Sequence, residues 1–233
     1  MEGIELQKLF YENQKLFSRI AREKMFRLIP NQDVYEKILK IKSLSIQDSS
    51  TDISFLIHLK DLFLLWMNNL GMDKVPPIIY KLNNLRELNM SGNLLSVIDP
   101  EFENLTKIQD IYLSRNNLRT VEINFEKLLE IELLNFRQNE LFALPNDICL
   151  LSKLKYLNVS RNQLDNLPVD FYKLKSLEIL DISYTKIRLD FGLLAEFEKL
   201  KEIRIKGSPI SYRKLERYLR SKAIKITIKG GMV

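Results

Sequence analysis

Residues that could perform catalysis are sparse in this sequence of 233 residues. His58 is the only histidine and Cys149 the only cysteine. A nucleophile needs a neighbouring general base, and a catalytic metal needs a cluster of histidine, cysteine or carboxylate ligands. The sequence shows no such cluster and no glycine-rich loop that could cradle a phosphate. It therefore favours a protein that is not an enzyme and that carries no cofactor or metal.

Side chains suited to binding recur instead at a constant spacing. The row that shows this best consists of Trp66, Asn89, Tyr112, Asn135, Asn158, Asp181 and Arg204, which lie 23 residues apart. Tryptophan, tyrosine and arginine dominate protein-binding hot spots because they bury large areas and make directed hydrogen bonds. This row therefore indicates a binding surface, provided that the fold brings its members together.

Apolar residues recur at the same interval and predict how those side chains are held. Successive 23-residue units begin at Leu62, Leu85, Ile108, Ile131, Leu154, Leu177 and Leu200. Apolar residues at the fourth and sixth positions, such as Leu157 and Val159, alternate with residues that are mostly polar, which is typical of a strand with one buried face. One unit cannot bury its apolar side alone, so neighbouring units must stack and share a core.

An asparagine occupies the ninth position of the four central units. These residues are Asn93, Asn116, Asn139 and Asn162, whereas Leu70, Thr185 and Ser208 stand there towards the ends of the array. The chain leaves the strand at this point, inside a core where backbone groups need partners. Because an asparagine amide both donates and accepts, stacked copies are expected to form a ladder that satisfies the turns of adjacent units.

The complete template, LxxLxLxxNxLxxLPxxFxxL, is clearest between Leu154 and Leu174. It resembles the leucine-rich repeat family, in particular intracellular Ras-group-like repeats and stand-alone bacterial repeat proteins. The resemblance implies an α/β fold, a leucine-rich repeat solenoid shaped as a curved horseshoe arc with a parallel β-sheet on its concave face. It covers about three quarters of the chain and specifies the fold far more strongly than the function.

Outward-facing positions of the strands form the expected binding site. Strands in such a sheet lie about 4.8 Å apart, so their outward side chains form one continuous surface. We expect a protein partner, whose identity the sequence does not give, to bind on this concave face. The candidate contact residues are Trp66, Asn89, Tyr112, Arg115, Asn135, Arg137, Tyr156, Arg161, Tyr184 and Arg204. The alternative is that exposed aromatic residues on a sheet merely reflect β propensity.

The two ends of the chain depart from the repeat. Near the start, Asp33 and Glu36 are spaced as a capping box within a helix-like apolar pattern. Near the end, Ser211 can cap a helix that precedes a final edge strand through Ile224, Ile226 and Ile228. We therefore expect a helical N-terminal cap (1–40), the repeats (41–210, roughly eight, the first degenerate) and a C-terminal cap helix and strand (211–233). Two caps indicate a free-standing module, although the first helix could instead dock on a partner or a membrane.

The C-terminal end suggests an alternative function. From residue 201 onward the chain has ten lysines and arginines against only Glu202 and Glu216. Such a basic patch could attract nucleic acid, acidic lipid or an acidic protein surface. A solvated cap helix explains much of this charge without any function, because cations are favoured near the C-terminal end of a helix.

Location is inferred from what the sequence lacks. The start, MEGIELQKLF, mixes acidic with apolar residues and does not resemble a secretory signal. No run reaches the roughly 20 apolar residues that span a bilayer, and a single cysteine cannot form an intramolecular disulfide. Glycans at Asn89 or Asn158 would obstruct the expected binding face. The sequence therefore predicts a cytoplasmic protein, expected to be a monomer, although export by a non-classical route would leave no visible mark.

Overall fold

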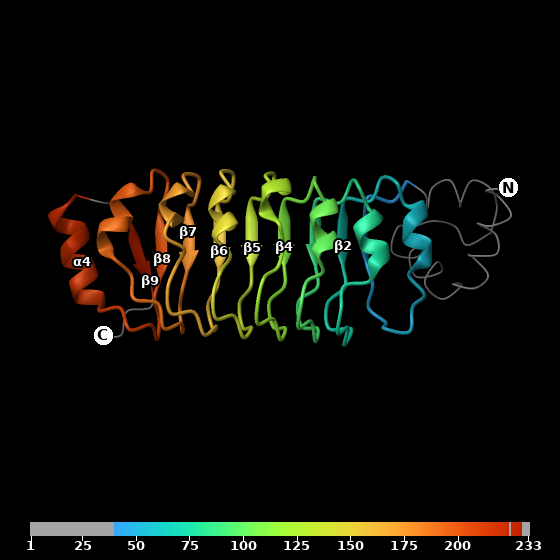
Figure 1. Ribbon diagram of the computed structural model, residues 1–233, viewed down its shortest axis with the longest axis horizontal. Coiled ribbons are helices and arrows are strands. Elements are labelled where there is room, and N and C mark those ends of the chain that lie inside the picture. The colour runs from blue at the N-terminus through green and yellow to red at the C-terminus, as the bar shows by residue number, and fades with distance from the viewer. Residues whose placement is uncertain (1–39, 224, 230–233) are drawn as a thin grey trace, which may run out of the picture.

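The structure is a computed structural model that describes residues 40–223 and 225–229. Its repeats stack side by side along one axis (Figure 1). The predicted N-terminal cap, apart from its last residue, lies outside the described residues and stays a prediction.

One parallel sheet runs the length of the described chain. Its nine strands lie in the order in which they occur in the sequence. Each register pairs equivalent positions of adjacent repeats, so that Leu65 lies beside Leu88 and Leu88 beside Ile111. The strands are β1 Ser43–Ser45, β2 Leu64–Trp66, β3 Glu87–Asn89, β4 Asp110–Tyr112, β5 Leu133–Asn135, β6 Tyr156–Asn158, β7 Ile179–Asp181, β8 Glu202–Arg204 and β9 Thr227–Lys229. The predicted parallel solenoid is therefore confirmed.

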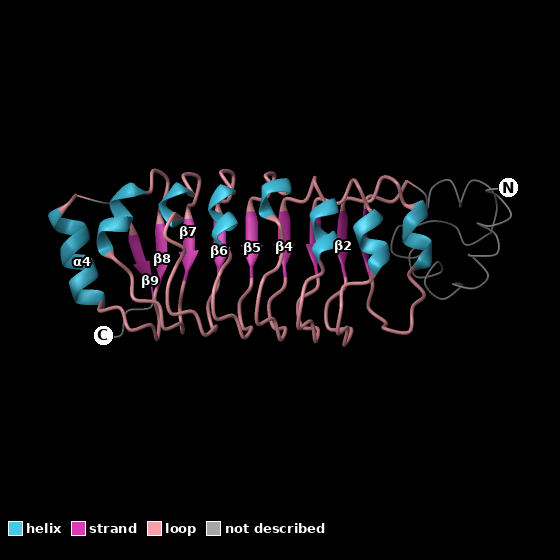
Figure 2. Cartoon of the chain, viewed as in Figure 1, coloured by secondary structure: helices cyan, strands magenta, loops and turns pink. Residues whose placement is uncertain are grey.

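Short 3-10 helices form the opposite layer and return the chain to the start of the next strand (Figure 2). They are η1 Ser54–His58, η2 Pro77–Lys81, η3 Pro100–Asn104, η4 Phe125–Lys127, η5 Asn146–Leu150, η6 Phe171–Lys173 and η7 Phe191–Glu196. Each of them buries at least one apolar residue, and Phe102, Phe125 and Phe171 have no exposed surface. Full burial of such a side chain stabilises the fold by about 1.5–3 kcal/mol.

The apolar core lies between these two layers and is continuous from repeat to repeat. The predicted inward strand positions are buried throughout. For example, Leu134 in β5 and Phe136 directly after it have no exposed surface. The polar residues between them point to the other side of the sheet, where they are half-buried or exposed in most repeats. The strand alternation predicted from the sequence is thus correct.

The asparagine ladder is also present. The Asn139 Nδ2 donates to the carbonyl oxygens of Leu113 and Phe136, each at 2.9 Å. Its Oδ1 accepts from the Leu118 backbone N–H at 3.1 Å. Asn93, Asn116 and Asn162 make the equivalent bonds in their own repeats. Each amide therefore joins the turns of two adjacent repeats, as backbone groups buried at a turn require.

The described part of the C-terminal end contains one α-helix and strand β9. Helix α4, Tyr212–Ser221, begins after Ser211, whose Oγ accepts from the Lys214 N–H at 3.4 Å. Its apolar side buries Leu215 and Leu219 against the last repeat. Strand β9 pairs with β8 in parallel and lies slightly later in the sequence than the pattern predicted. None of the helices in the described segments is long and apolar enough to cross a membrane.

Candidate functional site

The ten predicted contact residues all lie on the outward side of the sheet or at the edge where its strands end, which we call the carboxyl edge. Trp66 is 42% exposed and Tyr184 39% exposed, large values for aromatic side chains. Arg115, Arg137 and Arg161 are also exposed. The remaining candidates, Asn89, Tyr112, Asn135, Tyr156 and Arg204, are half-buried. The fold brings them onto one surface, while their role in binding stays a prediction.

Near the N-terminal end of this surface, aromatic and acidic side chains form a cluster of Trp66, Glu87, Asp110 and Tyr112. The Trp66 indole N–H donates to Glu87 Oε1 at 2.6 Å. Burial, together with the charges of Glu87 and Glu132, raises the pKa of Asp110. Burial and the nearby Asp110 also raise the pKa of Tyr112. Ionisation of Asp110 and Tyr112 is therefore disfavoured here, and perturbed pKa values of this kind are common at functional sites.

Two of the predicted contact residues have a structural role in the fold. Asn89 Oδ1 accepts from the Ser91 N–H and Asn135 Oδ1 from the Arg137 N–H, each at 3.1 Å. Such bonds fix the backbone as it leaves a strand. Sequence reasoning missed this role because it treated every outward polar residue as available for a partner.

The expectation that this whole surface is exposed is wrong at β6 and β7. Asn158 and Asp181 are only 5% and 8% exposed. The Asn158 Nδ2 donates to the Tyr156 hydroxyl at 3.1 Å, and Arg204 Nη1 lies 3.8 Å from Asp181 Oδ2. Larger neighbours thus fold over the shorter side chains, a packing that spacing alone does not reveal.

Arg204 is committed to internal partners. Its guanidinium pairs with Glu202 as well as with Asp181, and lies 6.0 Å from the centre of the Tyr156 ring. Hydrogen bonding to Glu202 is the main reason why the pKa of Arg204 is raised. Its charge is therefore largely satisfied within the molecule.

At the carboxyl edge, the residue before the ladder position adopts left-handed backbone angles in every central repeat. The φ angles are +58° at Arg115, +56° at Arg161 and +55° at Tyr184. Left-handed angles cost a residue with a side chain roughly 1–2 kcal/mol. The Arg161 guanidinium carbon lies 4.4 Å from the centre of the Tyr184 ring. That ring lies so close to Gly207 that a Cβ there would stand 2.5 Å from its Cδ1.

A row of exposed cations follows the same edge, and we call it the carboxyl-edge strip. Its members are Arg115, Arg137, Arg161, Lys186, Arg188 and Lys206. Between residues 40 and 229, leaving out 224, no ion pair involves any of them. The sequence prediction did not include Lys186 and Arg188, because they lie beyond the ladder position at Thr185 and the predicted contact residues all precede the ladder position of their repeat.

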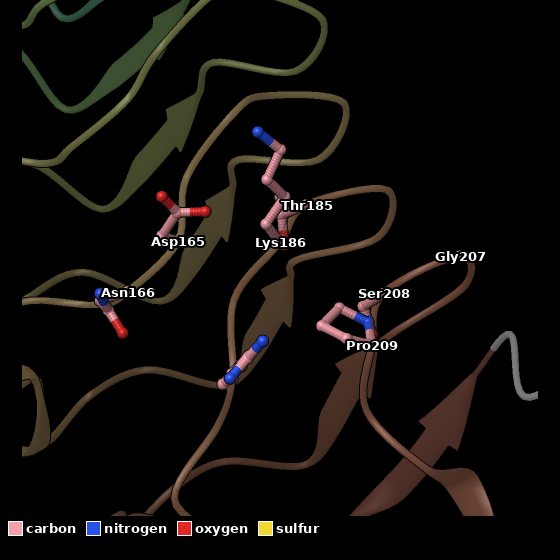
Figure 3. Close-up of a pocket in the computed structure, with 8 residues that line it drawn as sticks. Asp165, Asn166, Thr185, Lys186, Gly207, Ser208 and Pro209 are labelled. Carbon is pink, nitrogen blue, oxygen red and sulfur yellow. The ribbon is translucent and has the colours of Figure 1, made fainter.

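Lys186 and Arg188 line a hollow of about 850 Å³ that opens between three successive turns (Figure 3). Its other charged side chain is Asp165. The hollow lies where the asparagine ladder ends, at Thr185 and Ser208. The hydroxyls of these two residues donate to the carbonyls of Ile182 and Ile205, three residues earlier, at 2.7 and 2.8 Å.

The described residues offer little for catalysis. Cys149 is buried, and burial raises the pKa of its thiol to about 11, so that the thiolate nucleophile is scarce at neutral pH. No group of three histidine, cysteine or acidic side chains suited to a metal ion occurs among the residues that the structure places.

Comparison with known families agrees with the geometry. A model described as leucine rich repeat matches residues 130–187, and a second model of the same description matches residues 84–105. The chain is a leucine-rich repeat protein. Proteins of this family generally mediate protein–protein interaction and typically act as binding scaffolds instead of enzymes. A search of curated proteins found no match.

Solved structures of other leucine-rich repeat proteins share the fold. A leucine-rich repeat protein of Leptospira interrogans is 21% identical, with a TM-score of 0.59 over 83% of this chain and 61% of that one. The functional domain of InlJ from Listeria monocytogenes, which includes a cysteine ladder, is 20% identical, with a TM-score of 0.51 over 71% of this chain and 38% of that one. This chain therefore spans 61% or less of their lengths, and its ladder is built from asparagine.

Proposed function

We propose that the protein is a scaffold that binds another protein on the outward face of its sheet. The observation that carries this proposal is the exposure of Trp66 and Tyr184 on the same side of the sheet, or at the same edge, as three exposed arginines that form no ion pair within the described residues. The repeat template requires none of these side chains for folding, since its apolar positions lie on the other side of the strands. Aromatic and arginine side chains that converge on one surface are the usual composition of a binding hot spot.

A capture experiment with wild-type protein and a Trp66→Ala/Arg137→Glu variant tests this proposal. The partner captured from a lysate of the source organism is identified and then measured with purified proteins. We expect the variant to fold normally and to bind about 2 kcal/mol more weakly, roughly a 30-fold loss. A Leu150→Ala/Lys81→Glu variant makes matched changes on the 3-10 layer and should bind like wild type. Equal affinity of the sheet variant and wild type would place the binding site elsewhere.

The alternative function, binding of an anionic partner through the C-terminal end, has its own support. Helix α4 buries its apolar side, while Arg213, Lys214 and Arg217 on its other side are exposed. Nucleic acid bound there should dissociate steeply as salt is added, because binding releases counterions from the phosphates. An affinity that does not change with salt would exclude nucleic acid as the partner.

The proposed scaffold acts as a cytoplasmic monomer, and the buried, unpaired Cys149 supports a reducing environment. Residues 1–40 and 211–233 are proposed to cap the repeats of 41–210. The burial of Leu215 and Leu219 against the last repeat supports this role for α4.

A further inference from the structure

We infer that the carboxyl-edge strip docks an acidic segment of the protein partner, with side-chain carboxylates as its ligands. This inference rests on the proposed function and adds the chemistry of the partner. Arginine presents several N–H donors in a planar fork that matches both oxygens of a carboxylate. Arg115, Arg137 and Arg161 offer three such forks on consecutive repeats.

The strip differs from other cations of the same repeats. Towards the edge where the strands begin, Lys155 pairs with Glu132 and Lys201 with Glu178. At the C-terminal end, Lys229 pairs with Glu202 at 2.7 Å. Carboxylates are therefore available to neutralise cations elsewhere on these repeats, and the strip is left positive. Unpaired cations on one edge create the field that attracts and orients an acidic partner.

The geometry of the strip suits an extended segment. Its residues follow β4 to β8, and four intervals of about 4.8 Å give a span of roughly 19 Å. An extended chain covers that distance with about six residues. The strip is also partly ordered before binding, because the Arg161 guanidinium carbon lies 4.4 Å from the centre of the Tyr184 ring. Side chains that are ordered in advance lose less freedom on binding.

The surface favours a protein over a nucleic acid or a lipid membrane. The same side of the sheet carries Glu87 and Asp110, and Asp165 lies in the hollow beside Lys186. These carboxylates would repel a uniformly charged polyanion. A protein can place acidic residues over the strip and basic or apolar residues over Trp66 and Tyr112, so that both halves of the surface are matched.

A random-peptide selection tests the inference even while the natural partner is unidentified. The probe is a phage library of peptides of about twelve residues, twice the estimated span. It is selected against wild-type protein, the strip variant Arg115→Glu/Arg137→Glu/Arg161→Glu, and Trp66→Ala. A matched variant, Arg213→Glu/Lys214→Glu/Arg217→Glu, makes the same change of charge on α4. Urea unfolding verifies each fold, and Arg→Gln substitutions replace Arg→Glu if the strip variant is destabilised.

We expect wild type and the α4 variant to select peptides rich in aspartate and glutamate, and the strip variant to bind those peptides at least ten-fold more weakly. Peptides that lose binding on Trp66→Ala but show no acidic enrichment would overturn the inference and leave the proposed function standing. Selected peptides whose binding changes neither with Trp66→Ala nor with the strip variant would overturn both the inference and the proposed function. Loss of acidic peptides with the α4 variant alone would move anion recognition to the C-terminal end.

A second measurement separates peptide carboxylates from phosphates. A fluorescent single-stranded oligonucleotide and vesicles containing phosphatidylserine are titrated with wild type and with the strip variant. We expect weaker binding of both than of the selected peptides at physiological salt. Tighter binding of either one, abolished in the strip variant, would reject the protein segment in favour of a polyanion.

Discussion

Two adjacent residues after a strand differ sharply in burial in this molecule. Asn116 and Asn162 lie in the ladder, buried and hydrogen-bonded to two repeats. Arg115 and Arg161, one residue earlier, lie on the surface without an ion pair in the described chain. The left-handed turn between strand and ladder directs the two side chains apart. Under the proposed function, stability and recognition lie at adjacent positions, so a substitution in the ladder should lower stability without affecting binding.

The largest effect is expected inside the ladder. Asn139→Ala removes one acceptor and two donor interactions, leaving the Leu118 N–H and the carbonyls of Leu113 and Phe136 without this partner. Unsatisfied buried groups cost roughly 1–3 kcal/mol. We therefore expect the free energy of unfolding to fall by that amount in a urea titration, while peptide binding at the carboxyl edge is retained below the transition.

Asn117→Ala is the matched control, because Asn117 is an exposed asparagine in the turn of the preceding repeat. Exposed substitutions usually change stability by less than about 0.5 kcal/mol. An unchanged urea midpoint for Asn139→Ala would show that the ladder does not stabilise the turns, and the contrast between ladder and edge would fail.

The sequence predicts the ladder well and the surface less well, for a physical reason. Apolar and asparagine positions recur because every repeat must bury the same core, so their spacing encodes the burial of Leu134 or Asn139 directly. Whether a side chain on the outward face is exposed depends on the size and conformation of the neighbouring side chains that can cover it. That is why Asn158 was expected on the surface and is buried under Tyr156. Ion pairing likewise depends on rotamers and distances, so Arg204 and Arg161 appeared equivalent as candidates and are not.

A smaller change in the free energy of unfolding, of opposite sign, is expected at the carboxyl edge. Arg115→Gly relieves left-handed strain of roughly 1–2 kcal/mol, while the added freedom of glycine in the unfolded chain costs about 0.4–1 kcal/mol. We therefore expect a gain of up to about 1.6 kcal/mol in the free energy of unfolding, together with weaker binding of acidic peptides.

Arg137→Gly separates backbone strain from the loss of charge. Arg137 is an exposed arginine on the same edge, but it is not one of the left-handed residues. Glycine there should lower the free energy of unfolding by about 0.5–1 kcal/mol. It should weaken the binding of acidic peptides about as much as Arg115→Gly does. If both glycine variants changed stability in the same direction, the left-handed turn would not be the cause of the difference.

The smallest effect concerns Asp110, whose charge is unfavourable in the fold. Its pKa is raised chiefly by burial and further by Glu87 and Glu132. Because the pKa is higher in the folded than in the unfolded chain, the ionised carboxylate lowers stability at neutral pH, and protonation removes this penalty as the pH falls through the folded pKa. Asp110→Asn should therefore raise the urea midpoint slightly at pH 7. The difference from wild type should shrink on acidification and become constant below the unfolded pKa of about 3.9.

Salt then distinguishes the causes of this penalty. Screening at high salt weakens repulsion from Glu87 and Glu132 but leaves burial in place. Since burial is the largest cause, most of the gain from Asp110→Asn should persist at a salt concentration of about 1 M. A gain that disappeared in salt would mean that repulsion between carboxylates dominates. The aromatic–acidic cluster would then resemble the carboxyl-edge strip, as a surface whose uncompensated charge a partner of opposite sign relieves.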